Sequence, residues 1–229
     1  MQKSEINGCV TMNRKGFIFD LDGVIVDTAK YHYLAWKKLS ESIGIFFDEF
    51  QNEQLKGVSR INSLEKILNW GNMELSQDQF MELLARKNND YLNYISNMTQ
   101  SEILPDVVRV ISFLKDTKQS VALGSSSKNA RIVLKKLKLL NDFDAVVDGN
   151  NVSKAKPNPE VFLLAAEQLN VTPQDCVVFE DSVAGVKAAK DARMMCIGIG
   201  EQKVLQEADH VFSDFTEISN QFITQLIKE

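Results

Sequence analysis

The sequence predicts an α/β protein, with a doubly wound parallel sheet and an inserted all-helical block. Three observations support this fold class. Short apolar runs rich in β-branched and aromatic residues recur along the chain, as buried strands require. From Pro105 onward these runs alternate with helical patterns, which indicates a parallel sheet covered by helices on both faces. Between residues 29 and 101 the alternation stops, and only amphipathic helical segments are found.

The first predicted strand, residues 16–19, leads directly into the helical block. In this block His32, Trp36, Leu39 and Ile43 recur at helical spacing and form one face of a helix. A block inserted after the first strand is expected to lie over the carboxyl ends of the strands, where such sheets bind ligands. We therefore predict a sheet domain of residues 1–28 and 102–229 and a helical cap domain of residues 29–101, with hinges near residues 28–30 and 100–105.

The rest of the chain alternates regularly between strands and helices. Pro157 and Pro159 indicate a helix start, because proline is favoured in the first turn. Ser182 precedes an apolar periodic stretch, as an N-cap residue does. We expect further strands at residues 120–123, 145–147, 176–179, 195–199 and 210–212, and helices at about residues 106–117, 127–138, 158–169 and 182–192.

The composition excludes several classes of function. The chain has 229 residues, enough for one or two domains of ordinary size. Its 26 Lys and Arg against 31 Asp and Glu give a net charge of −5, and the absence of a basic block argues against binding to nucleic acid or an anionic membrane. No apolar run approaches the roughly 18 to 20 residues of a membrane span, and the first residues lack a signal-peptide core. We expect a cytoplasmic protein, and a monomer.

The three cysteines, Cys9, Cys176 and Cys196, are far apart and form no C-x-x-C pair. Neither a disulfide framework nor a zinc site is indicated, so free thiols are expected. Cys176 and Cys196 fall in predicted strands, where core packing explains them better than reactivity. Residues 1–11 are interpreted as an uninformative extension, with Met12 as the alternative start of the chain.

The most informative segment is FIFDLDGVIVDT, residues 17–28. Asp20 and Asp22 follow the first predicted strand, and Gly23 lets the backbone turn sharply. Two carboxylates at this place repel each other, and Mg²⁺, which prefers oxygen ligands, would relieve the repulsion. One aspartate could then attack phosphorus while the other transfers protons. Taken alone, the segment also fits an ordinary Asp-Gly turn without a catalytic role.

Two polar segments follow other predicted strands. GSSSKN, residues 124–129, offers the Ser125 hydroxyl, backbone N–H groups and a helix start to phosphate oxygens. KPNPE, residues 156–160, places Lys156 where its charge could offset a nucleophile and a phosphate. Taken singly, these segments also fit a helix cap and a solvated surface lysine.

An acidic segment, FEDSVAGVKAA at residues 179–189, adds Glu180 and Asp181 as oxygen ligands for a metal, although an acidic pair also favours a helix start. Four such segments in this order, each at the end of a predicted parallel strand, resemble the haloacid dehalogenase-like superfamily of aspartate-nucleophile phosphotransferases. The resemblance covers residues of about 15–30 and 104–200, and the helical block has the position of that superfamily's cap domain.

The resemblance to this superfamily implies a Rossmann-like core and a role for each of these side chains. Asp20 is implied as the nucleophile that becomes phosphorylated and Asp22 as the general acid/base, while Ser125 and Lys156 assist the transfer. The presence of Asp22 argues against the ion-pump and dehalogenase branches of the superfamily. Mg²⁺ is the implied cofactor, with Asp20, Asp22 through its backbone carbonyl, Glu180 and Asp181 as its ligands.

Three segments near or within the helical block resemble the β-phosphoglucomutase family of that superfamily: DTAKYHYLAWK at residues 27–37, QLKGVSR at 54–60 and ARKNNDY at 85–91. The resemblance implies that Arg60 grips the phosphate that is not being transferred and that His32 lies beside the acid/base. It also implies a hinge at Thr28 and a substrate site formed by Trp36, Gly57, Val58, Lys87, Asn88, Ser127, Lys128 and Asn129.

Physical reasoning supports this assignment only in part. A mutase must hold both ends of a sugar bisphosphate in turn, and an arginine such as Arg60 suits the bidentate grip on a phosphate, whereas a hydrolase mainly needs access for water. Without the resemblance, Arg60 also fits a solvated helix residue, and His32 fits an interface histidine.

The resemblance therefore implies a Mg²⁺-dependent phosphomutase that acts on a small phosphorylated sugar. It would interconvert β-glucose 1-phosphate and glucose 6-phosphate, with β-glucose 1,6-bisphosphate as the activating intermediate. The alternatives are a sugar-phosphate phosphatase with the same core and a non-catalytic phosphosugar-binding protein. Nucleotide binding is poorly supported, because Gly198-x-Gly200 lacks the remaining glycines of a dinucleotide motif.

Overall fold

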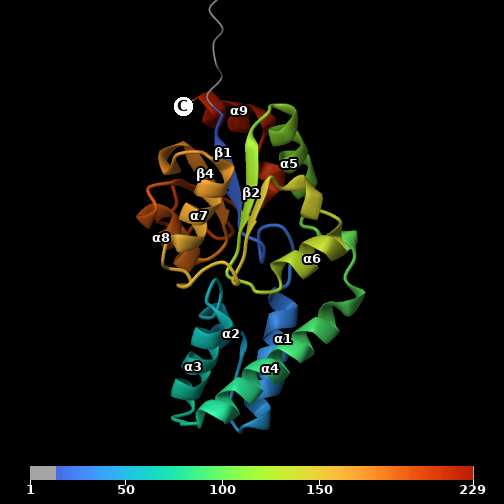
Figure 1. The fold of residues 1–229 in the computed structure, drawn as a ribbon, viewed down its shortest axis with the longest axis vertical. Helices are drawn as coiled ribbons and strands as arrows, with labels where there is room; N and C mark the ends of the chain where they lie inside the picture. The colour runs from blue at the N-terminus through green and yellow to red at the C-terminus, as the bar shows by residue number, and fades with distance from the viewer. Residues whose placement is uncertain (1–13, 229) are drawn as a thin grey trace, which may run out of the picture.

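The computed structural model describes residues 14–228 and confirms the predicted fold class (Figure 1). Within these residues, six parallel strands form one sheet in the order β3-β2-β1-β4-β5-β6. Cys9, Met12 and the predicted extension of residues 1–11 lie outside the described residues. The strands are β1 (Gly16–Phe19), β2 (Ser120–Gly124), β3 (Ala145–Val147), β4 (Cys176–Glu180), β5 (Met195–Ile199) and β6 (His210–Phe212).

Helices cover both faces of the sheet, because the strand side chains alternate between two apolar clusters. In β1, Phe17 and Phe19 belong to one cluster and Ile18 belongs to the other. The sheet is therefore doubly wound, as predicted. The Phe17 side is covered by α5 (Val107–Asp116), α6 (Ala130–Leu137) and α9 (Asn220–Lys228), and the Ile18 side by α7 (Glu160–Leu169) and α8 (Val183–Asp191).

The helix predicted at residues 127–138 begins only at Ala130. The Ser125 hydroxyl accepts a 3.1 Å hydrogen bond from the backbone N–H of Ser127, and the Ser127 hydroxyl accepts one of 3.3 Å from the backbone N–H of Asn129. Serine side chains that bond nearby backbone in this way compete with helix formation. The loop after β2 therefore extends further than the apolar pattern indicates.

Between β1 and β2 the chain forms a helical insertion next to the carboxyl ends of the strands (Figure 1). The insertion has its own apolar cluster, which includes Trp36 and Leu39, with Ile43 packed at its edge. That residues 29–101 form a separate cap domain, able to move about hinges, stays a prediction. The helices of the insertion are α1 (Ala29–Ser42), α2 (Glu49–Glu53), α3 (Arg60–Trp70) and α4 (Gln77–Tyr94).

The two connections between the insertion and the sheet run side by side. Val26 on the outgoing connection forms an antiparallel bridge with Ile103 on the returning one. The Glu102 carboxylate accepts hydrogen bonds from Lys30 Nζ at 2.7 Å and from the Tyr31 hydroxyl at 3.0 Å. The first turn of α1 is thereby tied to the returning connection.

Cys176 in β4 and Cys196 in β5 are both buried, which agrees with the expected core packing. Burial raises the pKa of the Cys176 thiol to about 12 and raises that of Cys196 as well. Both thiols are therefore protonated and unreactive near neutral pH. None of the described helices has both the length and the apolar character that a membrane crossing requires.

Candidate active site

The four polar segments found in the sequence meet at one edge of the sheet. Asp20 follows β1, Ser125 follows β2 and Glu180 ends β4. Because β1 lies between β2 and β4, these three side chains come from neighbouring strand ends. Lys156 reaches the same place from the loop between β3 and α7. The strand order reverses between β1 and β4, and parallel sheets of this kind bind ligands in the crevice at such a point.

Lys156 lies between two buried carboxylates. Its Nζ is 2.6 Å from Asp20 Oδ1 and 2.5 Å from Glu180 Oε1. The lysine is 1% exposed, so it is not a solvated surface residue. Burial alone would lower the pKa of Lys156, but the charges and hydrogen bonds of the two carboxylates outweigh it and raise that pKa. The lysine is therefore a fixed positive charge beside Asp20.

Asp20, Glu180 and Asp181 form an acidic cluster in which one oxygen of each side chain lies within 4.8 Å of the others. Burial raises the pKa of Asp20 to about 7 and raises that of Asp181 well above its ordinary value, with Glu180 adding to both shifts. Ser182, the N-cap of α8, donates to Glu180 Oε2 from its backbone N–H at 2.8 Å and from its hydroxyl at 2.9 Å. Crowded carboxylates that ionise reluctantly fit a hard divalent cation such as Mg²⁺.

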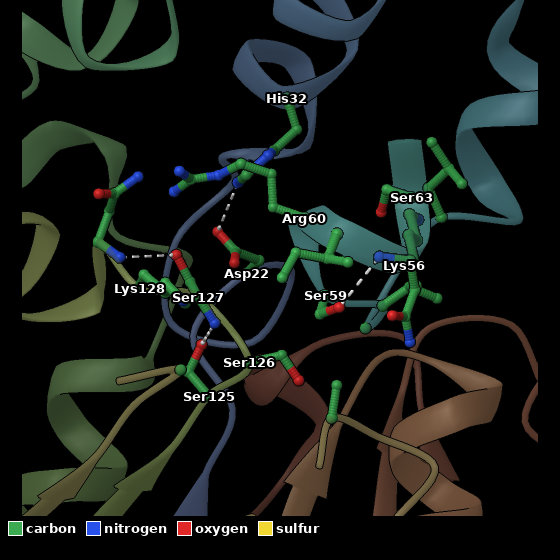
Figure 2. A pocket seen from close by; sticks show the side chains of 18 of the residues that line it. Asp22, His32, Lys56, Ser59, Arg60, Ser63, Ser125, Ser126, Ser127 and Lys128 are labelled. Atoms are coloured by element: carbon green, nitrogen blue, oxygen red, sulfur yellow. Dashed lines mark hydrogen bonds and ion pairs between the residues drawn. The ribbon is translucent and has the colours of Figure 1, made fainter. Parts of the chain in front are cut away.

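The carboxylate of Asp22 does not point into this acidic cluster but towards Thr28 and His32. The Thr28 hydroxyl donates to Asp22 Oδ1, and His32 Nε2 is 3.9 Å from the same oxygen (Figure 2). The side chain of Asp22 is not a member of the acidic cluster, so its expected share in a metal site is restricted to the backbone carbonyl. Burial raises the pKa of Asp22 to about 6, although Lys87 and Lys156 act against this shift.

Lys87 and His32 form a close pair beside Asp22. Lys87 Nζ is 2.8 Å from His32 Nδ1 and lies 4.6 Å from the ring centroid of Trp36. Burial lowers the pKa of both side chains well below their ordinary values, and the nearby charge of Arg60 lowers them further. A neutral His32 that accepts at Nδ1 carries its proton on Nε2, the atom that faces Asp22.

A cavity of about 770 Å³ separates the insertion from the strand ends. Figure 2 shows Arg60 on the insertion side and the loop of Ser125, Ser127 and Lys128 on the sheet side. Most of the predicted site residues line this cavity. The lining set includes Asp20, Asp22, His32, Trp36, Gly57, Val58, Arg60, Lys87, Ser125, Ser127, Lys128, Asn129 and Asp181.

Four predicted site residues lie behind the wall of the cavity instead of lining it. Lys156 donates hydrogen bonds to Asp20 and to Glu180, and the Thr28 hydroxyl donates one to Asp22. Asn88 is likewise absent from the lining and accepts a hydrogen bond from Asn129 of the sheet side, and its contact with substrate stays a prediction.

Arg60 is the first residue of α3, which begins after its N-cap Ser59. Within residues 14–228, no carboxylate lies at ion-pair distance from its guanidinium. The side chain reaches from α3 towards Asp22 and His32 (Figure 2). An arginine without a partner on the wall of a cavity is suited to bind a phosphate group.

The structure gives the predicted residue Gly57 a contact that the sequence does not show, and it adds one residue that the sequence did not single out, Tyr91. Gly57 has a φ of 71°, and a Cβ there would overlap the Ser182 hydroxyl, so this is where the insertion touches the start of α8. Tyr91 is fully buried one helical turn after Lys87, with its ring centroid 4.2 Å from that of His32. The one available signal for Tyr91 is its spacing from Lys87 on one helix face.

Comparisons with known proteins find a matching family model, similar sequences and a similar solved structure. Residues 14–193 match the family model described as haloacid dehalogenase-like hydrolase. A β-phosphoglucomutase of Bacillus subtilis is 44% identical over 207 residues, which are 90% of this chain and 92% of the relative. A crystal structure of β-phosphoglucomutase from Clostridium difficile superposes with a TM-score of 0.90 at 39% identity, over 93% of this chain and 97% of that one. A phosphorylated carbohydrates phosphatase of Thermotoga maritima is 32% identical over 201 residues, 85% of this chain and 91% of the relative.

Proposed function

The chain belongs to the haloacid dehalogenase-like hydrolase family, and on that basis we propose that it is a phosphomutase that interconverts β-glucose 1-phosphate and glucose 6-phosphate. The observation that carries the proposal is a cavity that has groups suited to bind anions on both sides. Asp20 and the loop of Ser125 line it on the sheet side, and Arg60, which has no ion-pair partner within residues 14–228, lines it on the insertion side. Two anion sites facing each other suit a sugar that carries a phosphate at each end.

In the proposed cycle Asp20 is already phosphorylated when β-glucose 1-phosphate binds. The C6 hydroxyl attacks the phosphorus of the aspartyl phosphate, and Asp22 takes the hydroxyl proton, which gives β-glucose 1,6-bisphosphate. This intermediate turns end for end. Asp20 then takes the phosphoryl group from C1, Asp22 returns the proton to the departing oxygen, and glucose 6-phosphate leaves.

The surrounding side chains have supporting roles in this proposal. Lys156 neutralises charge next to Asp20 and the Ser125 loop donates to phosphate oxygens, while Arg60 holds the phosphate that is not transferred. Lys87 and His32 form a pair beside Asp22 and line that part of the cavity. The other substrate contacts are assigned to Trp36, Gly57, Val58, Asn88, Ser127, Lys128 and Asn129.

Asp20, Glu180, Asp181 and the backbone carbonyl of Asp22 are the residues that would hold Mg²⁺. The cation supplies a positive charge that polarises phosphoryl oxygens and offsets the repulsion between phosphate and carboxylate. The insertion supplies the exclusion of water, because it forms one wall of the cavity.

The test is the conversion of β-glucose 1-phosphate in the presence of Mg²⁺ and a trace of the bisphosphate, with glucose 6-phosphate and free phosphate recorded together. The proposal expects glucose 6-phosphate without matching release of phosphate, and no turnover in Asp20→Ala. Asp27→Ala is the matched control, since Asp27 belongs to the same segment and is exposed.

A sugar-phosphate phosphatase is the second candidate function. The Thermotoga maritima relative carries a phosphatase name at 32% identity, and the acidic cluster and Lys156 suit either reaction. Release of phosphate without isomerisation in the same assay would favour this candidate and leave the proposed roles of Asp20 and Asp22 in place.

A further inference from the structure

The loop after β2, residues 125–129, lines the cavity and is in contact with a second loop that the proposed cycle does not use (Figure 2). The second loop, residues 148–151, follows β3, the neighbour of β2 in the sheet. The backbone N–H of Ser125 donates a 3.0 Å hydrogen bond to the carbonyl of Val147, which continues the pairing of the two strands. The loop after β3 is therefore placed to hold the shape of the loop after β2.

Gly149 brings the backbones of the two loops together. Its N–H donates a 3.3 Å hydrogen bond to the carbonyl of Ser127. A Cβ at this position would overlap the carbonyl oxygen of Ser126 and would lie 3.0 Å from the backbone nitrogen of Lys128. Because these are backbone atoms, they could not move aside without displacing the loop after β2. The close approach of the two loops therefore requires glycine here.

Asn150 contacts the loop after β2 through its side chain. Its Nδ2 donates two hydrogen bonds of 3.0 Å, one to the backbone carbonyl of Lys128 and one to Asp148 Oδ1. An amide nitrogen carries two N–H donors, so both are used. A carboxylate oxygen accepts hydrogen bonds, so Asp148 determines which end of the amide faces Lys128.

The side chain of Asp148 is a fixed anchor for this contact. It is 1% exposed, and its Oδ1 also accepts a 2.8 Å hydrogen bond from the backbone N–H of Asn150. Its Oδ2 lies 3.2 Å from Nε of Arg131, whose Nη2 donates to the carbonyl of Val146. A buried carboxylate needs such partners. Asn150 itself is exposed and does not line the cavity, so its bond to Lys128 acts from outside the site.

We propose that Asn150 is a positioning residue for substrate binding, which holds the carbonyl of Lys128 and thereby keeps residues 127–129 in the shape that lines the cavity. A peptide unit is planar, so a carbonyl that is held fixes the orientation of the whole unit between Lys128 and Asn129. A loop that is already ordered loses less conformational freedom when substrate binds, and therefore binds it more tightly. The inference rests on the proposed function, because there this loop is assigned to the substrate.

The first test is the steady-state kinetics of Asn150→Ala. The KM for β-glucose 1-phosphate should rise about fivefold while kcat stays within about twofold, because the loop binds the substrate and the transition state alike. Gly149→Ala displaces the same loop through its backbone and should also raise KM. Asn141→Ala changes an exposed asparagine before β3 and is the matched control, which should leave KM unchanged.

The second test is limited proteolysis with trypsin, which cleaves after lysine. The bond after Lys128 contains the carbonyl that Asn150 holds. Cleavage there should be about fivefold faster in Asn150→Ala, because the loop opens more often without the hydrogen bond. Cleavage after Lys203, an exposed residue in the turn that follows β5, is the internal control in the same digest and should keep its rate.

The inference requires both a raised KM and faster cleavage at Lys128. An unchanged KM would overturn it, and so would a raised KM with unchanged cleavage, since the effect would then not pass through the loop. Faster cleavage at both lysines would also overturn it, because Asn150 would then stabilise the whole fold. If the wild-type enzyme releases phosphate and does not isomerise, the proposed mutase function fails. The inference is then decided by the KM for phosphate release.

Discussion

Asn129 Nδ2 donates a 2.9 Å hydrogen bond to Oδ1 of Asn88, so the loop after β2 is joined directly to α4 of the insertion. Asn129 lines the cavity and Asn88 lies just behind its wall. The pair therefore closes one side of the space between the insertion and the strand ends. A hydrogen bond at this place favours the closed cavity, and a closed cavity would keep water from the phosphorylated Asp20 that we propose.

Replacing Asn88 by alanine should shift the balance of products from isomerisation to hydrolysis. The loss of one hydrogen bond, about 1 kcal/mol, corresponds to roughly a fivefold fall in the ratio of glucose 6-phosphate to free phosphate. The measurement is the simultaneous assay of both products. Asn89→Ala changes the next residue of the helix, which is exposed, and should leave the ratio unchanged. Equal ratios in the two variants would remove any role for the Asn88–Asn129 contact in closing the cavity.

Gly57→Ala and Gly44→Ala form a matched pair. Both glycines have a positive φ, 71° and 74°, so each substitution should cost about 1 kcal/mol of stability through backbone strain. A Cβ at Gly57 also overlaps the Ser182 hydroxyl, whereas one at Gly44 has no atom within 4 Å. We expect similar thermal midpoints but a loss of kcat/KM, about tenfold, in Gly57→Ala alone. Equal activity in the two variants would show that the contact with Ser182 is dispensable.

Arg60→Ala should separate the two candidate functions. A mutase loses its hold on the second phosphate, so transfer should fall at least a hundredfold, about 3 kcal/mol for a charge-assisted pair, while hydrolysis is retained or increased. Arg86→Ala removes an exposed arginine of α4 and serves as the control. A phosphatase for a small monophosphate should be affected little by either substitution.

Lys156→Met should destabilise the protein. Asp20 and Glu180 would lose the cation that compensates them in a buried site, which typically costs about 3–5 kcal/mol. Thermal or denaturant unfolding with a chelator present measures the loss. Lys154→Met, an exposed lysine two residues earlier, should change stability by less than about 0.5 kcal/mol. Comparable unfolding of the two variants would mean that Asp20 and Glu180 do not depend on Lys156 for their burial.

The metal-free protein should lose stability as the pH rises from about 4 to about 7. Burial raises the pKa of Asp20 to about 7 and that of Asp22 to about 6 from an ordinary 3.8, so in this window the folded protein binds protons that the unfolded chain has released. Such a contribution is complete below the unfolded pKa and disappears as pH passes the folded one.

Mg²⁺ should reverse this trend, because it binds the ionised carboxylates of the folded state. Thermal unfolding at about pH 5 and about pH 8, with chelator and with Mg²⁺, should show the larger stabilisation by Mg²⁺ at the higher pH. The Asp20→Asn variant should show a smaller pH dependence with chelator than the wild type. A pH dependence identical in both proteins would contradict the raised pKa of Asp20.

The strands of the fold could be predicted closely because their signal is local. Each strand is a short apolar run, and the residues of β1, β3, β5 and β6 agree with the expected bounds. The start of α6 could not be predicted in this way. The side chains of Ser125 and Ser127 accept hydrogen bonds from backbone groups of the following loop, and the helix therefore begins later in the chain. The apolar pattern that predicts the helix contains no information about those hydrogen bonds.

The residues of the site also fall into two groups, those that a local segment of sequence reveals and those whose surroundings only the fold determines. Asp20 and Asp22 are recognisable in one segment, but the partners of Lys156 are 136 and 24 positions away, so its burial follows only from the fold. Tyr91 escaped notice for the same reason. Its spacing from Lys87 fits an ordinary helix face, and the contact of its ring with that of His32 depends on how α4 packs against α1.

The bridge between Val26 and Ile103 gives the molecule a modular architecture. The chain departs from the sheet and comes back at two hydrogen-bonded neighbours, so the whole stretch between them could be shortened, lengthened or exchanged without altering any strand pairing. Closing so small a gap with a short loop has little entropic cost. Evolution could therefore vary the helical insertion while the residues at the strand ends, to which we assign phosphoryl transfer, stay unchanged.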